Sequence, residues 1–360
     1  MIKRVLFPLL CAIIIGGCSD KTLVSSGNEA LLLSINEKDG YEEIVIRNPK
    51  GKETARYALA DKNRTDKLDL PEGTSVINVP VDRIVLDSEV YGGALEELGT
   101  SDKIKGMFDA GYATSQSLKN RIERGEIENL GPPGSPNNEL IVSLEPDVII
   151  LSYFEGMNAQ GLEDLGPTVI KMLDLQEPTP TGRAEWIRLL GRLTGKAEES
   201  DSIFNEVKNR YADISETPKK NDKPRVLTEL MYEGVWNTAS SNSYHAKLIR
   251  DAGGEYFTDE ESASGTLNLT PEQALYKGGD SDIWLIRYYG SEEDLRKILA
   301  SDPVYREFEA YKKGNIYFSD TSTSGLFRDF PFHPELLLED YKKIFSGETT
   351  GLRYFKRLGE

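Results

Sequence analysis

The sequence predicts an α/β fold of two Rossmann-like lobes joined by a single long rigid helix, with an N-terminal β-hairpin extension. Short apolar segments alternate with segments of helix length, and one long stretch with helical periodicity interrupts this alternation. The segments before and after that stretch also repeat the same helix-then-strand pattern. A length of 360 residues favours two domains over one, because single hydrophobic cores rarely grow to this size.

The lobes are expected over residues 76–180 and 224–345, from the positions of their apolar strand candidates. These candidates are rich in β-branched and aliphatic residues, as buried strands are. They lie at residues 83–86, 148–151 and 168–171 in the first lobe, and at 225–228, 282–286 and 315–318 in the second.

Between the lobes, residues 181–215 are predicted to form the connecting helix. Apolar side chains recur there at near-helical spacing: Trp186, Leu189, Leu190, Leu193, Ile203, Phe204, Val207 and Tyr211. A polar segment with Pro218 and Pro224 then ends the helix. Residues 346–360 are expected to be a C-terminal tail.

The start of the chain predicts an exported lipoprotein. Lys3 and Arg4 precede an apolar run over residues 5–15, which is followed by two glycines and Cys18. This pattern is typical of a signal peptide over residues 1–17, and the run is too short for a membrane-spanning helix. We therefore expect a chain in the cell envelope, facing the periplasm or the external side and touching the membrane only through a lipid on Cys18.

After this segment, residues 18–28 are polar and small, which predicts a flexible tether. Residues 29–75 are expected to form a β extension. Its strand candidates at 41–47 and 54–59 are separated by Asn48-Pro49-Lys50-Gly51, a turn sequence, so they are predicted to pair as a hairpin.

The composition argues against two kinds of partner and against an internal disulfide. The chain has 60 acidic and 43 basic residues and a formal net charge of −17, which argues against nucleic acid or an anionic membrane surface as a partner. Of its two cysteines, Cys11 lies in the predicted signal peptide, so the mature chain is expected to have no internal disulfide.

The repeated pattern in the two halves centres on two glutamates. Glu139 lies in the first turn of a short predicted helix that precedes the strand at 148–151. Glu272 lies in the first turn of a second such helix, where Thr270 and Gln273 make a capping box. Because ligands usually bind in clefts between domains, two similar lobes predict an interlobe site.

These segments together resemble the solute-binding proteins of ABC importers for iron-siderophores, haem and cobalamin. The resemblance runs from about residue 81 to residue 341, and each segment alone is weakly specific. Its carriers are residues 83–86, 98–99, 102–106, 138–141 and 144–149 in the first lobe, and 248–254, 269–273 and 282–284 in the second.

The resemblance implies a monomeric binding protein that works with an ABC permease and ATPase complex and needs no cofactor. It implies that Glu139 and Glu272 dock into arginine-lined pockets of the permease, which would set register and orientation. The alternative is that each glutamate is only favoured by the helix dipole. The implied cargo is a ferric siderophore or similar iron complex, with haem or a cobamide as alternatives.

Ligand contacts are expected from loops at the carboxyl ends of the strands. These loops are rich in aromatic residues, which offer flat apolar faces and polar tips to an amphipathic ligand, although packing in a lobe core is an alternative for each. Arg287 and Arg328 are the candidates for binding an anionic chelate. The aromatic candidates are Tyr91, Tyr112, Tyr153, Phe154, Tyr232, Trp236, Tyr244, Tyr288 and Tyr289.

An enzyme is the competing interpretation. The sequence contains no Gly-x-Ser-x-Gly, phosphate-loop, Gly-x-Gly-x-x-Gly or His-Glu-x-x-His motif, so no catalytic residue is proposed and carboxylate chemistry stays a distant alternative. With two histidines, His245 and His333, a multi-imidazole metal site is not expected. Either histidine could be an axial haem ligand, and a surface or capping role is the alternative.

Overall fold

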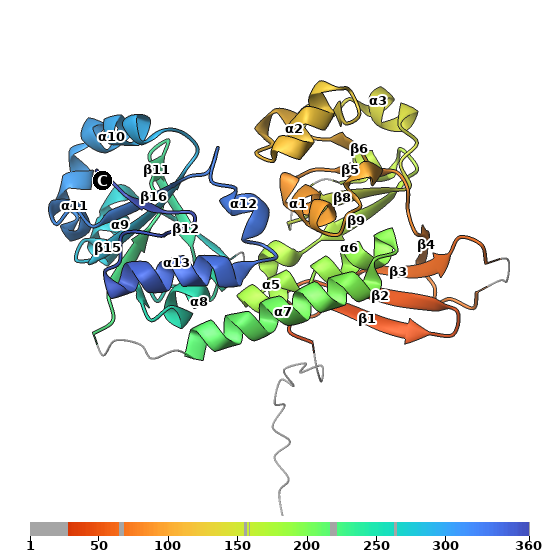
Figure 1. The fold of residues 1–360 in the computed structure, drawn as a ribbon, viewed down its shortest axis with the longest axis horizontal. Coiled ribbons are helices and arrows are strands. Elements are labelled where there is room, and N and C mark those ends of the chain that lie inside the picture. Colours follow the sequence, from red (N-terminus) through yellow and green to blue (C-terminus); the bar gives the residue numbers. More distant parts are fainter. Residues whose placement is uncertain are drawn as a thin grey trace, which may run out of the picture.

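The computed structural model has two lobes side by side, with helix α7 (Ala197–Glu216) running beneath both (Figure 1). It describes residues 28–64, 68–154, 157, 159–216, 222–262 and 265–359. The predicted signal peptide, Cys18 and most of the tether lie outside this part of the chain. Within it, every helix is too short or too polar to cross a membrane.

The N-terminal lobe contains a five-stranded parallel sheet with the order β7-β6-β5-β8-β9. Its strands are β5 (Ile84–Leu86), β6 (Ile104–Met107), β7 (Glu128–Asn129), β8 (Val148–Ser152) and β9 (Thr168–Met172). Its helices are α1 (Glu89–Glu97), α2 (Gln116–Glu123), α3 (Asn138–Ser143) and α4 (Gln160–Glu163).

The C-terminal lobe contains a second five-stranded sheet with the order β13-β10-β15-β16-β17, and a small sheet with the order β11-β12-β14. Its strands are β10 (Arg225–Thr228), β11 (Met231–Tyr232), β12 (Val235–Ala239), β13 (Glu255–Tyr256), β14 (Thr266–Leu269), β15 (Ile283–Tyr288), β16 (Ile316–Asp320) and β17 (Lys356–Arg357). Its helices are α8 (Tyr244–Asp251), α9 (Pro271–Gly278), α10 (Glu292–Ser301), α11 (Glu309–Lys312), α12 (Leu326–Asp329) and α13 (Pro334–Ser346).

The repeat seen in the sequence is a repeat of topology. In the N-terminal lobe, β5 pairs in parallel with β8, the strand that follows α3. In the C-terminal lobe, β10 pairs in the same way with β15, the strand that follows α9. The predicted α/β fold is confirmed, and α3 and α9 occupy equivalent positions in the two lobes.

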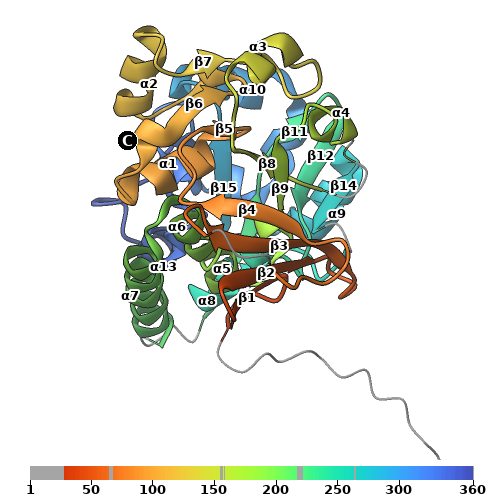
Figure 2. The same ribbon diagram turned by 90° about the vertical axis from the view of Figure 1, so that its right-hand side faces the viewer.

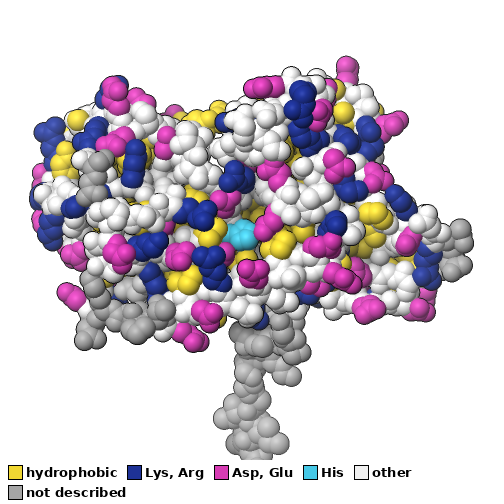
Figure 3. Space-filling view, in the orientation of Figure 1, with side chains coloured by type: hydrophobic (Ala, Val, Ile, Leu, Met, Phe, Trp, Pro, Cys, Tyr) yellow, Lys and Arg dark blue, Asp and Glu magenta, His cyan; other side chains and the backbone are white. Residues whose placement is uncertain are grey.

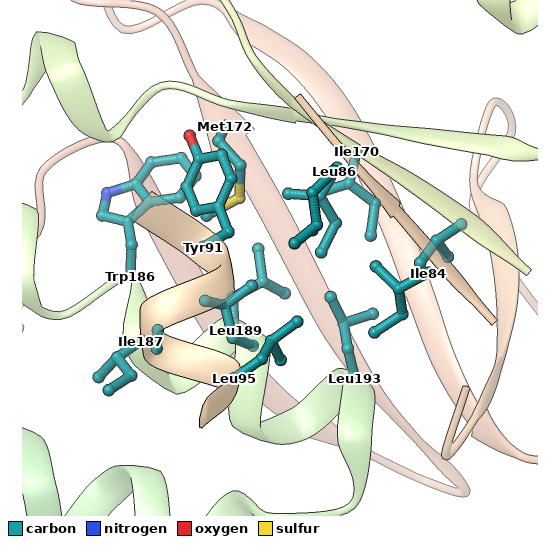
Figure 4. Close-up of a cluster of buried hydrophobic side chains, with 14 of the residues drawn as sticks. Ile84, Leu86, Tyr91, Leu95, Ile170, Met172, Trp186, Ile187, Leu189 and Leu193 are labelled. Carbon is teal, nitrogen blue, oxygen red and sulfur yellow. The ribbon is translucent and has the colours of Figure 1, made fainter. Parts of the chain in front are cut away.

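One face of the N-terminal sheet packs on helices α1 and α6 (Ile187–Thr194). Figure 4 shows Leu86 and Ile170 of the sheet in one cluster with Leu189 and Leu193 of α6, all of them buried. Parallel strands covered on both faces read as continuous apolar runs, which explains why these strands were predictable.

The N-terminal extension is a sheet rather than a hairpin alone. The expected pair corresponds to β2 (Tyr41–Arg47) and β3 (Glu53–Asp61), flanked by β1 (Leu33–Lys38) and β4 (Ser75–Val79) in the order β1-β2-β3-β4. β4 pairs with β3 in parallel and crosses the expected boundary at residue 75. The sheet lies beneath the N-terminal lobe (Figures 1 and 2) and adds Ile44 and Leu59 to its core, so the extension is part of that lobe.

The prediction of one helix over residues 181–215 is wrong. The stretch contains α5 (Pro180–Ala184), α6 and α7, and Gly195 ends α6 in the left-handed conformation with φ 77°. Helix α7 then packs back on α6, where a Cβ on Gly191 would lie 2.1 Å from the Ser200 hydroxyl oxygen. This close approach requires glycine at position 191.

Residues 346–360 were expected to be a tail, and this expectation also needs correction. Strand β17 pairs antiparallel with β16 at the edge of the C-terminal sheet. Tyr354 and Phe355 are buried, and the Asp340 carboxylate accepts hydrogen bonds from the backbone N–H groups of residues 353–355. The end of the chain is thus a structural part of the second lobe.

Candidate functional site

Two exposed tyrosines from opposite lobes meet between the lobes. Tyr112 follows β6 and Tyr289 follows β15, so both lie at carboxyl ends of parallel strands. Their ring centroids are 5.5 Å apart with an interplanar angle of 71°, an edge-to-face contact. The residues remain 62% and 55% exposed, so the two rings contact each other and still face solvent.

Arg287, at the end of β15, is partly buried and already paired. Its Nε lies 2.7 Å from Oε1 of Glu229, and its Nη2 contacts the same oxygen. Burial lowers the pKa of Arg287, but the Glu229 carboxylate more than offsets this, so the pKa is raised above its ordinary value. Its guanidinium carbon lies 5.7 Å from the ring centroid of the exposed Phe327.

Arg328, on α12, lies against helix α1 of the other lobe. A Cβ on Gly93 would lie 2.4 Å from Arg328 Cγ, so the arginine stem rests on the glycine backbone. Arg328 Nε donates to Asp329 Oδ1 at 2.8 Å, and this hydrogen bond raises the pKa of Arg328. Glu89 and Glu96 of α1 raise it further through their charge. Arg328 is therefore a contact between the lobes.

The other exposed or half-buried aromatic candidates come from several elements of both lobes. Phe154 is 58% exposed after β8, and Tyr232 is 70% exposed in β11. Tyr153 is half-buried with Lys171 Nζ 5.1 Å from its ring centroid, and Tyr288 is half-buried against the C-terminal core.

Two residues expected in the interlobe site are core residues. Trp236 is fully buried, stacks on Trp284 at 5.6 Å and donates Nε1–H to the Thr228 carbonyl. Tyr91 is 1% exposed and lies beside Trp186 and Met172 in the N-terminal core, as Figure 4 shows. Their burial removes both from the set that can touch a ligand.

Behind Tyr91 lies a buried polar network that the sequence did not indicate. The Tyr91 hydroxyl donates to Asp174 at 2.9 Å and lies 3.0 Å from the Ser152 hydroxyl. Asp87, directly after β5, accepts a hydrogen bond from the Ser152 N–H at 2.7 Å. Burial raises the pKa of Asp87 to about 7 despite these hydrogen bonds.

The network crosses to the C-terminal lobe through Arg183. Its Nε donates to Asp174 at 3.0 Å and its Nη1 donates to the Tyr244 hydroxyl at 2.7 Å. The guanidinium carbon also lies 4.8 Å from the Tyr244 ring centroid. Tyr244, expected among the ligand contacts, is thus half-buried at the junction of the lobes.

Both histidines are engaged by protein groups. His333 Nε2 lies 2.8 Å from Glu97 Oε2 in the N-terminal lobe, and Nδ1 lies 3.1 Å from Glu335 Oε1. His245 is buried with Nε2 2.9 Å from the Tyr341 hydroxyl, and burial lowers its pKa. Across the described residues, no group of three or more His, Cys, Asp and Glu side chains is arranged to hold a metal ion.

The two glutamates of the repeat are exposed in the first turns of equivalent helices. Helix α3, with Glu139, is capped by Asn137, whose side chain accepts from Leu140 N–H at 3.1 Å. Helix α9, with Glu272, begins with the predicted capping box. Glu272 accepts hydrogen bonds from its own backbone N–H and from the Thr270 hydroxyl, which lower its pKa.

Residues 84–323 match the model of a family described as periplasmic binding protein. The chain belongs to this family. Its members are binding proteins and not enzymes, which confirms the choice of a binding function over catalysis. The matched segment begins at β5, so the sheet β1–β4 precedes it.

Two relatives and two solved structures extend this similarity. The chain is 29% identical over 299 residues to an uncharacterized lipoprotein of Methanocaldococcus jannaschii, with 75% of each chain covered. It is 23% identical over 275 residues to a cobalamin-binding protein of Halobacterium salinarum, covering 74% of this chain and 72% of the relative.

The solved structures show the same fold. One is the triscatecholate siderophore binding protein of Bacillus subtilis complexed with ferri-bacillibactin, with a TM-score of 0.59, 17% identity, and coverage of 79% of this chain and 99% of that one. The other is a periplasmic heme binding protein from Pseudomonas aeruginosa, with a TM-score of 0.61, 17% identity, and coverage of 78% and 99%.

Proposed function

We propose that this periplasmic binding protein is the lipid-anchored substrate-binding component of an ABC importer, capturing a ferric siderophore or similar iron complex between its lobes. The observation that carries the proposal is the pair of Tyr112 and Tyr289, exposed at strand ends of opposite lobes and already in contact. Aromatic rings offer flat apolar faces with polar tips, which suit an amphipathic ligand.

Charge supports an anionic chelate as the cargo. Arg287 lies at the end of β15 and Arg328 lies on α12, and each guanidinium uses only part of its five N–H donors on Glu229 or Asp329. The side chains of Arg328 and Arg287 are 31% and 17% exposed, so we propose that their remaining N–H groups donate to oxygen atoms of a chelate. Phe154 and Tyr232, both exposed, complete the proposed set of contacts.

Two observations favour an iron chelate over haem or a cobamide. Haem bound through an axial histidine is not supported, because His333 is held by two carboxylates and His245 is buried against Tyr341, which leaves tyrosine as the axial ligand that haem would need. A tryptophan sandwich around a corrin is not supported, because Trp186, Trp236 and Trp284 are all buried. The names of the cobalamin-binding relative and the heme-binding structure keep both cargoes as alternatives.

Delivery of the cargo to the permease would depend on the two exposed glutamates and on the lipid anchor. Glu139 and Glu272 would dock on the permease, and Cys18 would carry the lipid that keeps the protein at the membrane. The lobes would part by a small rotation, because α7 packs on helices of both lobes and resists bending.

The test is to titrate the purified protein separately with ferric enterobactin, ferrichrome, ferric citrate, haemin and cyanocobalamin. Binding is measured as a change in the intrinsic fluorescence of the protein. We expect saturable quenching by at least one ferric chelate and a loss of about tenfold in affinity for Tyr112→Ala and Tyr289→Ala. Tyr276→Ala, another exposed tyrosine, is the control and should bind normally. If only haemin or cyanocobalamin bound, the cargo would be haem or a cobamide and not a ferric chelate. If none of the five compounds bound, the proposed class of cargo would be refuted.

A further inference from the structure

Each lobe exposes an apolar side chain one helical turn after its proposed docking glutamate. On α9, Tyr276 follows Glu272 at the i+4 position and is 90% exposed, more than any other exposed large hydrophobic residue in the described chain. On α3, Val142 follows Glu139 at the i+3 position and is 51% exposed. Residues at these spacings share one face of a helix, so each carboxylate has an apolar neighbour.

The glutamates on these faces are not neutralised by the protein itself. Among the described residues, neither Glu139 nor Glu272 takes part in an ion pair, whereas Glu292 and Glu293 of α10 pair with Arg296 and Lys297 at the i+4 position. On α9 the i+4 position holds Tyr276 in place of a cation. An exposed carboxylate beside an exposed ring is suited to a partner that offers a cation next to an apolar depression.

The arrangement occurs twice at equivalent places in the fold. Helices α3 and α9 each precede the strand that pairs with the first strand of their sheet, β8 with β5 and β15 with β10. The capping box fixes the start of α9, and Asn137 caps α3, so both faces are held before any partner binds. A partner that fits one face should therefore offer a second, similar site for the other.

We infer that the external surface of the ABC permease binds Tyr276 and Val142 together with Glu272 and Glu139. This inference rests on the proposed function, in which the two glutamates dock on the permease. Tyr276 is the larger anchor, because a buried aromatic side chain contributes most to interfaces of this kind. By excluding water it also strengthens the attraction between Glu272 and a permease cation.

The experiment measures binding of the ligand-free protein to its permease–ATPase complex in lipid nanodiscs by biolayer interferometry, so it does not depend on the cargo. We expect Tyr276→Ser to weaken binding about tenfold or more and Val142→Ser about threefold. Tyr276→Phe should bind nearly as well as the native protein, because the ring is retained. Val76→Ser is the matched control, since Val76 is a 46% exposed valine on β4, and it should have no effect.

The outcomes separate this inference from docking itself. Loss of binding in Glu139→Gln/Glu272→Gln with normal binding in Tyr276→Ser and Val142→Ser would overturn the inference and leave glutamate docking intact. Normal binding in all of these variants would overturn both. If Tyr276→Ser instead abolished self-association of the protein in sedimentation experiments and left nanodisc binding unchanged, the face would be a contact between copies, and the inference would be wrong.

Discussion

His333 of the C-terminal lobe bonds to Glu97 of the N-terminal lobe across the boundary between them, with Nε2 2.8 Å from Oε2. The same imidazole bonds to Glu335 through its other nitrogen. Burial alone would lower the pKa of His333, but the two carboxylates raise it to about 10. The ring is therefore an imidazolium that ties the lobes together at neutral pH.

This link predicts a pH-dependent contribution to stability. A histidine with a raised pKa in the folded state stabilises the fold fully below its unfolded pKa of about 6.5, and this contribution is lost as pH rises through about 10. His333→Gln should lower the free energy of unfolding by about 2 kcal/mol at pH 6, after allowing for solvent screening of the partly exposed ion pairs. Urea unfolding at several pH values measures this difference.

The difference in the free energy of unfolding between the native protein and His333→Gln should disappear near pH 10.5. There the His333 imidazole is mostly neutral, like the glutamine side chain that replaces it. A deficit of the same size at pH 6 and pH 10.5 would show that His333 acts through packing rather than through its charge.

The contact between Gly93 and Arg328 predicts that a methyl group can separate the lobes. Gly93→Ala places a Cβ against the Arg328 stem, an overpacking that costs about 1–3 kcal/mol unless the lobes move apart. Small-angle scattering should therefore record a larger radius of gyration. Gly111→Ala is the control, because a Cβ there meets no atom within 4 Å. Gly93→Ala/Arg328→Ala should restore the native value, and a double variant as open as Gly93→Ala would argue against this contact.

The burial of Trp236 predicts that it supports the fold and not the ligand. Trp236→Phe removes the hydrogen bond to the Thr228 carbonyl and part of the stack on Trp284, so the free energy of unfolding should fall by about 1–3 kcal/mol. Affinity for the bound chelate, measured well below the melting temperature, should not change. If Trp236→Phe kept the native stability but bound the chelate more weakly, Trp236 would be a ligand contact and this prediction would be wrong.

Asp87 predicts a second loss of stability with rising pH, over a lower pH range than that of His333. Because its pKa is raised to about 7, the native state holds this proton more tightly than the unfolded chain does. The contribution to stability therefore falls as pH rises from about 4 to about 7. Asp87→Asn, which can still accept from the Ser152 N–H, should be about 1–2 kcal/mol more stable than the native protein at pH 8. Thermal melting at pH 4.5 and pH 8 tests this, and an equal effect at both values would contradict it.

The exposed glutamates predict a variant that binds cargo and does not deliver it. Glu139 and Glu272 are both exposed and lie outside the proposed ligand contacts, so Glu139→Gln/Glu272→Gln should leave ligand affinity unchanged. Uptake of the chelate by cells or proteoliposomes should be lost, since docking depends on both charges. Native uptake by the double variant would refute the docking proposal.

The sequence predicted those strands and helix ends that are determined by neighbouring residues in the chain. The strand at 148–151 was predictable because it is buried on both faces, and the start of α9 because Thr270 and Gln273 form a capping box. The end of α6 at Gly195 carried a usable signal, since glycine commonly closes a helix, but the helical spacing on both sides concealed the break.

The candidate site was predicted less completely, because composition of a loop does not fix the direction of a side chain. Trp236 lies in a strand whose buried and exposed residues alternate, and this alternation would have placed it inside. The contacts of Tyr112 with Tyr289 and of His333 with Glu97 join residues far apart in the chain, and only the packing of the two lobes determines them.

Helix α7 has one further consequence. Phe204 and Val207 belong to the hydrophobic core of the first lobe, and Tyr211, one turn later, belongs to that of the second. Melting either core would therefore strip apolar contacts from the same helix and weaken the other. The protein should unfold as one cooperative unit, and scanning calorimetry should record a single heat-absorption peak with equal calorimetric and van't Hoff enthalpies.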